Sequence, residues 1–165
     1  MIKDLQVTRR HKGFTLIELL VVISVIGILA SLAIVSFSGS QKQARDTQRK
    51  SDLKQFQNSL ELFANRNDGN FPSRTDATGA NASSTLCNDL GLTSCPEDPR
   101  FDEDNSFVYK YQSDGTGASS VDALNYVLWG KLENTSVTTY WVYCSSGTAG
   151  EATSGIPPVA GACPI

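Results

Sequence analysis

A run of apolar residues near the start of the chain constrains the fold more than any other feature. It extends over 24 residues, from Phe14 to Phe37, without a proline, and its single charged residue is Glu18. A helix needs about 20 apolar residues to cross a bilayer. A charged side chain in such a helix costs roughly 2.5–3.5 kcal/mol on insertion scales. We therefore expect one membrane-spanning helix in which Glu18 has a specific role.

Charge is distributed unevenly along the 165 residues. Residues 1–13 carry four basic side chains and one acidic side chain, whereas the chain from Arg66 onward carries five basic and twelve acidic ones. Basic residues before an apolar helix favour a cytoplasmic N-terminus. The acidic globular part argues against DNA binding driven by its own electrostatic field. The short basic stretch between Lys42 and Lys54 is the one exception to this acidic character. The apolar run also exceeds the core of an ordinary secretory signal, about 7–15 residues.

The pattern after the apolar run predicts that the same helix continues. Apolar residues recur at spacings of three and four, in the order Leu53, Phe56, Leu60 and Phe63. This is the stripe of an amphipathic helix that packs on a core. Gly69, with Pro72 just beyond it, is typical of a helix end. We expect a helix over residues 14–66, apolar all round in its first half and amphipathic in its second half.

The remaining chain shows strand patterns and predicts an α+β fold. The strand candidates are FVYKY (107–111), ALNYVLWGKLE (123–133) and VTTYWVYC (137–144). They fit a small antiparallel meander of three or four strands against the long helix. The expected parts are a leader (1–13), an apolar helix (14–38), an amphipathic helix (39–68), and a head (69–165) of loops and sheet with a Gly/Ser/Pro-rich tail.

Four cysteines follow the apolar run, at Cys87, Cys95, Cys144 and Cys163. An even number of cysteines after a membrane signal favours two disulfides in an oxidising compartment over four free thiols. Their spacing does not match the Cys-x-x-Cys pairs of zinc sites. Three connectivities are possible, and proximity in sequence favours Cys87–Cys95 and Cys144–Cys163.

Residue types argue against an enzyme. The only histidine is His11, in the leader, so the chain beyond it has no histidine for a Ser-His-Asp or Cys-His site. Neither a P-loop nor a GxGxxG motif is present. We therefore expect no catalytic residues, no small-molecule substrate and no cofactor, with one conditional exception given below.

The segment KGFTLIELLVVISVIGILASLA resembles the N-terminus of the type IV pilin and pseudopilin superfamily. The matching features are the basic leader, Gly13 before the apolar run, Phe14, and Glu18. The resemblance implies a pilin-like fold. It also implies that a prepilin peptidase cuts between Gly13 and Phe14 and methylates the new amino group of Phe14.

The resemblance further implies assembly into a helical filament through the apolar helices. The partners would be other copies of the chain, minor pilins, the peptidase and an inner-membrane assembly platform. The expected function is a structural subunit of a type IV pilus-like filament, or alternatively a pseudopilin of type II secretion or DNA uptake. Before assembly the chain would cross the inner membrane once, with its head outside the cytoplasm, and afterwards lie in a surface pilus or a periplasmic pseudopilus.

Two site assignments accompany this resemblance. Opposite charges stabilise each other in apolar surroundings, so Glu18 is expected to pair with the Phe14 amine of a neighbouring subunit and set its register. The major pseudopilin of type II secretion binds calcium in the loop before its last strands. Asp98, Asp102 and Asp104 supply carboxylates in that neighbourhood, although the spacing matches no EF-hand and a solvated acidic loop is the favoured interpretation.

Overall fold

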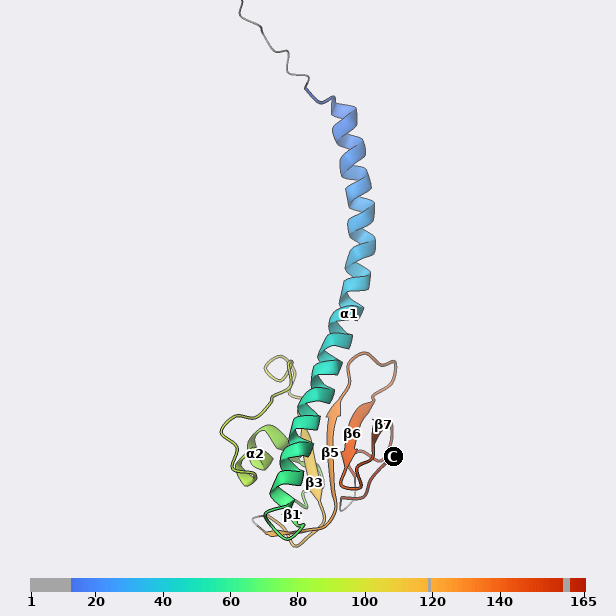
Figure 1. Cartoon of the computed structure of the whole chain (residues 1–165). Helices are drawn as coiled ribbons and strands as arrows, with labels where there is room; N and C mark the ends of the chain where they lie inside the picture. The colour runs from blue at the N-terminus through green and yellow to red at the C-terminus, as the bar shows by residue number, and fades with distance from the viewer. Residues whose placement is uncertain (1–12, 119, 159–160) are drawn as a thin grey trace, which may run out of the picture. The chain divides into compact units, whose positions relative to one another are not determined.

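The structure is a computed structural model that describes residues 13–118, 120–158 and 161–165. Apart from Gly13, the predicted leader lies outside the described residues. Helix α1 extends from Leu16 to Ala64, 49 residues, which confirms the prediction of one continuous helix (Figure 1). The chain divides into two compact units at the Gly39–Ser40 junction, and α1 contributes a segment to each.

Helix α1 ends at the predicted stop signal. The backbone N–H of Gly69 donates to the carbonyl of Ala64 at 2.9 Å. Asp68 and Gly69 have φ angles of 54° and 84°, the left-handed conformation that glycine adopts without a steric penalty. This geometry satisfies one carbonyl of the last helical turn. The chain then reverses into the short strand β1, Phe71–Pro72.

Five antiparallel strands form the main sheet of the second unit. In spatial order they are β2 (Ala80–Asn81), β3 (Lys110–Ser113), β5 (Tyr126–Lys131), β6 (Tyr140–Cys144) and β7 (Ala149–Ala152). Figure 1 shows the last four side by side. Strand β1 pairs separately with β4, Val121–Ala123. Between β2 and β3 lie the π-helix η1, Ala82–Leu86, and the short helix α2, Cys87–Asp89.

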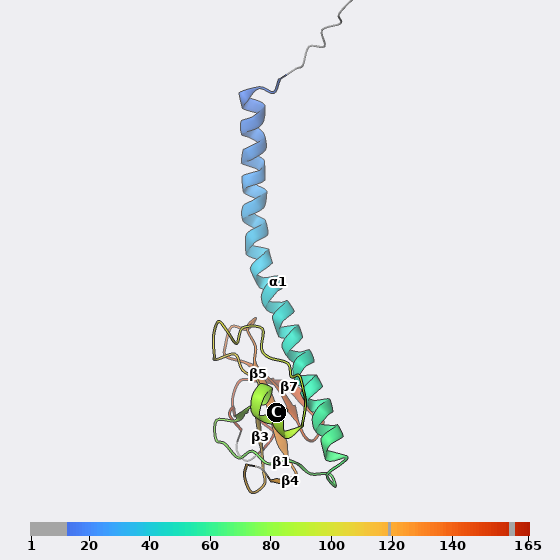
Figure 2. The same cartoon turned by 90° about the vertical axis from the view of Figure 1, so that its left-hand side faces the viewer.

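The second half of α1 packs its apolar stripe on one face of this sheet. The main buried residues are Leu53, Phe56, Leu60 and Ala64 from α1, and Tyr109, Tyr111, Tyr126 and Leu128 from the sheet side. Figure 2 shows this part of α1 running along one side of the strands. Burying an apolar side chain of this size stabilises the fold by about 1.5–3 kcal/mol, so this interface is the main core. The Tyr109 hydroxyl in this core donates to Asp52 at 2.7 Å.

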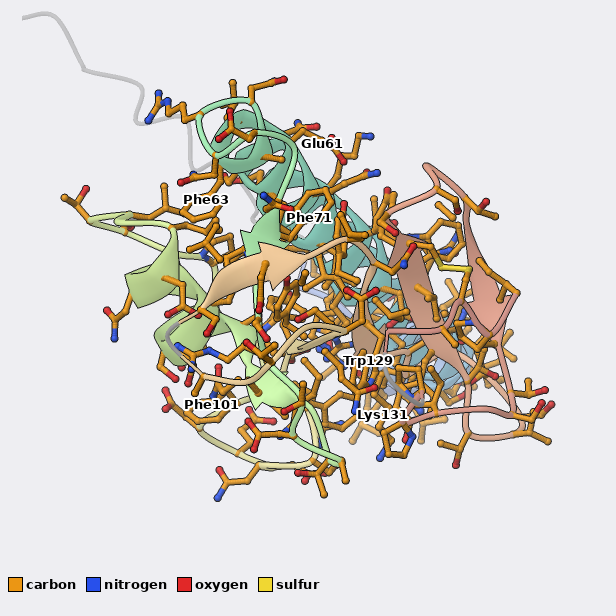
Figure 3. The ribbon with its side chains drawn as sticks, turned by 90° about the horizontal axis from the view of Figure 1, so that it is seen from below. Glu61, Phe63, Phe71, Phe101, Trp129 and Lys131 are labelled. Carbon is orange, nitrogen blue, oxygen red and sulfur yellow. A yellow bond between two sulfur atoms is a disulfide. The ribbon has the colours of Figure 1, made fainter. Side chains whose placement is uncertain are left out.

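The opposite face of the sheet has a smaller core of its own. Its buried members are Val127, Trp129, Val142, Cys144 and Ala152. Figure 3 labels Phe71 and Trp129, one residue from each cluster. The C-terminal tail joins this face through the disulfide Cys144–Cys163, as expected from sequence. The other disulfide is Cys87–Cys95, so both have the pairing favoured by proximity.

Two expectations about the head need correction. Phe63 is only partly buried and borders shallow surface hollows, while Ala64 continues the buried stripe after Leu60. The expected meander had three or four strands, but Ala149–Ala152 in the tail forms β7, and the main sheet has five strands. The residues of β7 have low strand propensity, so the pairing with the edge of β6 depends on backbone hydrogen bonds rather than on side chains.

Candidate functional site: the start of the apolar helix

The first turn of α1 is closed by reciprocal hydrogen bonds between Thr15 and Glu18. The Glu18 carboxylate oxygen Oε2 accepts from the backbone N–H of Thr15 at 2.8 Å and from its hydroxyl at 2.7 Å. In return, the backbone N–H of Glu18 donates to Thr15 Oγ1 at 3.3 Å. With Thr15 immediately before the first helical residue, Leu16, this is a capping box. It satisfies two backbone donors that would otherwise be left unpaired at the helix start.

The capping box gives Glu18 a local role that our sequence reasoning missed. Unpaired N–H groups are costly in apolar surroundings, and a carboxylate near a helix N-terminus is favourable for the helix dipole. The pattern Thr-x-x-Glu before an apolar run is a recognisable signal for this motif. Thr15 was therefore recognisable from the sequence as a hydrogen-bond partner of Glu18.

One oxygen of the Glu18 carboxylate remains available. Both hydrogen bonds to Glu18 go to Oε2, and Oε1 accepts none from the described residues. The carboxylate can therefore cap its own helix and accept a further donor at the same time. Because a carboxylate oxygen carries two lone pairs, a positively charged amine is a suitable partner for Oε1.

The Gly13–Phe14 junction lies just before the helix and is open on all sides. A Cβ placed on Gly13 would have no atom within 4 Å. The side chain of Phe14 is 92% exposed. Neither residue is assigned to α1, which begins at Leu16. The described residues therefore leave the peptide bond between Gly13 and Phe14 accessible to another protein.

The apolar segment that follows is uncovered by the rest of the described chain. Every residue from Phe14 to Leu32 is exposed. The helix contains an 18-residue window of mean hydropathy 2.8, long and apolar enough to cross a membrane. Its two serines satisfy their hydroxyls internally, because Ser24 donates to the Val21 carbonyl and Ser31 to the Ile28 carbonyl, each at 2.7 Å. A surface of this kind requires lipid or other apolar helices around it.

A second charged cluster lies in the second unit, residues 40–165, where Arg49 of α1 is completely buried. Its Nε and Nη2 donate to the two carboxylate oxygens of Asp98 at 2.7 and 2.9 Å, and its Nη1 donates to Asp46 at 2.8 Å. The guanidinium also lies 4.6 Å from the ring centroid of Phe107. Burial alone would lower the pKa of Arg49, but these hydrogen bonds raise it above its ordinary value. Arg49 therefore stays charged and fixes the 96–105 loop to the helix.

Glu133 extends this cluster to the segment after β5. Arg45 donates two hydrogen bonds to it, at 2.8 and 2.6 Å, and Arg100 donates a third at 3.2 Å. The hydrogen bonds from Arg45 lower the pKa of Glu133 to about 2. Asp46 accepts the backbone N–H groups of Glu133 and Asn134, both at 2.8 Å. These ion pairs join α1 to two loops, and Arg100 pairs in addition with Glu103 at 3.2 Å.

This cluster corrects the role expected of Asp98. Both of its carboxylate oxygens are bound to Arg49 and its exposure is 5%, so it is an ion-pair partner and not an open calcium ligand. Asp102 is exposed, and Asp104 accepts a hydrogen bond from the backbone N–H of Ser106 at 2.9 Å. In the part of the chain that the structure describes, no three such side chains are arranged to hold a metal ion.

Comparisons with known proteins converge on the same N-terminal region. The family model for the prokaryotic N-terminal methylation motif matches residues 8–34, which include Gly13, Phe14 and Glu18. The chain is 40% identical over 55 residues to the type II secretion system core protein G of Aeromonas hydrophila, covering 33% of this chain and 38% of that protein. It is 39% identical over 59 residues to the type IV major pilin protein PilA of Myxococcus xanthus, covering 36% and 27%.

A longer and weaker match reaches into the head. The core protein G of Dickeya chrysanthemi is 27% identical over 110 residues, 67% of this chain and 66% of that protein. The chain thus spans well under half the length of the two relatives above and about two thirds of this one. No solved structure gives a significant match.

Proposed function

We propose that this chain, which carries the prokaryotic N-terminal methylation motif, is the structural subunit of a type IV pilus-like filament. One observation carries the proposal: a long apolar helix, uncovered by its own chain, begins directly after an open Gly13–Phe14 junction and holds a single carboxylate in its first turn. A soluble role leaves the apolar surface unexplained, and a simple membrane anchor leaves Glu18 unexplained.

Processing comes first in the proposed sequence of events. A prepilin peptidase cuts between Gly13 and Phe14 and transfers a methyl group to the new amine of Phe14. The open surroundings of Gly13 and the exposure of Phe14 support access of such an enzyme. Before assembly, the apolar part of α1 crosses the inner membrane, with the head outside the cytoplasm and the assembly platform as a further partner.

Assembly then depends on the pairing of Phe14 and Glu18 between subunits. The free amine of Phe14 is a cation at the end of an apolar helix, and it would be costly to bury alone. Glu18 keeps its own helix capped through Oε2, while Oε1 accepts the amine of a neighbouring subunit. A subunit in the wrong register would leave both charges unpaired in apolar surroundings. The pair therefore selects one axial position for each copy, and minor pilins with the same motif can join the same filament.

The test uses one substitution that should block assembly and one that should block cleavage, each in cells that lack the natural chain. Glu18→Ala should be cleaved normally, since the junction is unchanged, but should give no filaments. Gly13→Val should remain uncleaved in the membrane, because the peptidase needs a small residue before Phe14. Ser24→Ala, which changes a polar residue in the same apolar segment, serves as a matched control and should assemble. Normal filaments from Glu18→Ala subunits alone would contradict the pairing mechanism.

The alternative function is a pseudopilin of type II secretion or DNA uptake. It is supported by the relatives named type II secretion system core protein G, which include the longest match reported above. Both functions use the same helix and the same N-terminal chemistry. Immunogold imaging of whole cells separates them: long surface filaments that contain this chain support the pilus, and their absence under native expression supports the pseudopilus.

A further inference from the structure

An apolar hollow lies on the surface of the second unit, at the end where α1 finishes. It has a volume of about 120 Å³, and we call it the Phe63 hollow. Its wall consists of Ser59, Leu62, Phe63 and Arg66 from α1, and of Leu90 and Leu92 from the segment after α2. Leu62 is 58% exposed, and the other three apolar side chains are partly exposed. Single exposed apolar side chains are common, but four around one hollow indicate a contact surface.

The wall of the Phe63 hollow carries one charge, that of Arg66. Arg66 is exposed and forms no ion pair within the described ranges. Its neighbours in sequence, Glu61 and Asp68, are not part of the wall, and Glu61 accepts the hydroxyl of Tyr126 at 3.2 Å. A partner that matches this surface therefore presents an aliphatic side chain with negative charge close to it.

Two loops, residues 96–105 and 132–139, form the opposite end of the second unit. Both are bound to α1 through the charged cluster around Arg49. At 1.5 Å per residue, Arg49 lies about 20 Å along the helix axis from Leu62. Figure 1 shows the two loops, yellow and orange, where α1 enters this unit, and the green end of α1 at the other extreme. The loops and the Phe63 hollow are therefore surfaces at opposite ends of one rigid unit.

The two loops present both features that the hollow requires. Val137 is 61% exposed at the tip of the second loop. The other exposed aliphatic residues described in this unit lie elsewhere: Leu62 in the hollow, Val121 on β4, Leu124 directly after β4, and Ile165 at the C-terminus. In the first loop, Glu97 and Asp102 are exposed and form no ion pair with any described residue. An aliphatic knob and unpaired carboxylates thus occur at the same end.

We propose that Val137 of one copy inserts into the Phe63 hollow of the next copy along the filament. Arg66 of that hollow then faces Glu97 and Asp102 of the inserting copy, and this charge complementarity orients the two copies. A cavity of about 150 Å³ lined by Leu, Ile and Phe holds one benzene molecule, so the Phe63 hollow is large enough for one valine side chain.

The occupant is a second copy because the two surfaces complement each other and belong to the same chain. They lie at opposite ends of the unit, so a contact between them leaves one free surface of each kind on every pair of copies. Such a head-to-tail contact repeats without closing and generates a helical polymer. The inference rests on the proposed function, and it adds a contact between heads to the pairing of Phe14 and Glu18.

Oxidative cross-linking of the full chain in cells tests the contact. Leu62→Cys and Val137→Cys are introduced together, at two exposed positions that are too far apart within one chain to form a disulfide. The proposal predicts dimers, trimers and longer oligomers on a non-reducing gel, because each copy carries both halves of a contact that does not close. Leu62→Cys with Ile165→Cys is the matched control pair and should give no such ladder.

The same experiment separates this inference from the proposed function. Filaments that contain the Leu62→Cys, Val137→Cys chain but give no ladder overturn the contact and leave the filament function standing. A wild-type chain that forms no filament at all counts against the proposed function instead. If the double-cysteine chain does not assemble, the charge variants below decide.

Charge variants give a second readout that does not depend on new cysteines. Val137→Lys places a cation beside Arg66 in apolar surroundings and should lower the yield of sheared filaments by about tenfold or more. Combining it with Arg66→Glu supplies a partner for the new lysine and should restore at least part of the yield. Ile165→Lys makes the same change at an exposed aliphatic residue outside both surfaces and should assemble normally. Equal yields from Val137→Lys and Ile165→Lys, or no rescue by Arg66→Glu, would overturn the proposal.

Discussion

Replacing Arg49 with methionine tests whether the buried charge cluster holds the head together. Arg49 has no exposed surface and makes hydrogen bonds to Asp98, Asp46 and Glu133. The substitution keeps most of the side-chain volume but removes the cation. It leaves the carboxylate of Asp98, which is 5% exposed, without its partner. Removing one partner of a buried ion pair typically costs about 3–5 kcal/mol, and we expect a loss of that size in the free energy of unfolding.

The assay is guanidinium denaturation of the full chain in detergent micelles, followed by tryptophan fluorescence. Trp129 and Trp141 both lie in the second unit, so the signal reports on the head. Adding Asp98→Asn to Arg49→Met should restore roughly 1–3 kcal/mol, because the buried charge left behind is then neutral. Lys50→Met is the control: it removes an ion pair with Glu151 at 3.4 Å and a cation–π contact with Trp141 at 4.1 Å, both partly exposed, so the expected loss is about 1 kcal/mol. A loss below about 1 kcal/mol for Arg49→Met, or a double variant no more stable than the single one, would refute the reasoning.

Three further predictions concern the head. Hydrogen bonds from Arg45 lower the pKa of Glu133 from 4.5 to about 2, so its contribution, roughly 3 kcal/mol at most, is complete above pH 4.5 and is lost as pH falls towards 2. Glu133→Gln should therefore reduce the loss of unfolding free energy as the pH falls from 4.5 towards 2. Burial raises the pKa of Asp52, which changes the unfolding free energy with pH in the opposite direction. Asp52 is present in both proteins, so its effect cancels when the two are compared. Replacing Cys144 and Cys163 with serine should cost roughly 3 kcal/mol, since the disulfide closes a segment with a sequence separation of 19; an unchanged denaturation midpoint would show that the tail is held by other contacts. Because Arg49 occupies the Asp98 carboxylate, a calcium chelator should leave the melting temperature of the head unchanged, and a clear decrease would restore the calcium hypothesis.

The long helix and the sheet could be predicted from sequence because their signals are periodic. The apolar run and the stripe through Leu53, Phe56 and Leu60 define α1, and all three residues are buried as expected. The alternation of Phe107, Tyr109 and Tyr111 predicted a strand over 107–111. All three side chains are buried as expected, but β3 extends over Lys110–Ser113 and includes only Tyr111 of the three. Such patterns depend on spacing alone and do not require knowledge of distant contacts.

The buried charges could not be predicted in the same way. Asp46, Arg49 and Asp52 lie on the face of α1 that continues towards Leu53, but charged residues on a helix usually face solvent. Their burial depends on Asp98 and Glu133, which are 49 and 84 residues beyond Arg49 in the chain. Nothing local in the sequence indicates that pairing. The short basic stretch between Lys42 and Lys54 therefore includes a completely buried cation, Arg49.

The start of the helix is an intermediate case. Glu18 was identified from its charge in an apolar run, and the Gly13–Phe14 junction from a family resemblance. The capping role of Glu18 follows from a local pattern, Thr15 three residues before it, that needs no tertiary information. The structure shows that the cap uses only Oε2 and leaves Oε1 for the pairing that we propose.

Mass spectrometry of filaments sheared from cells tests the central claim most directly. If this chain is a processed filament subunit, its N-terminal peptide begins at Phe14 and carries one methyl group on the amine. The cysteine-containing peptides of the same chain should be recovered from the same fraction, since the head remains attached. Filament fractions that lack the chain, or a chain that still begins before Gly13 when recovered from filaments, would contradict the account.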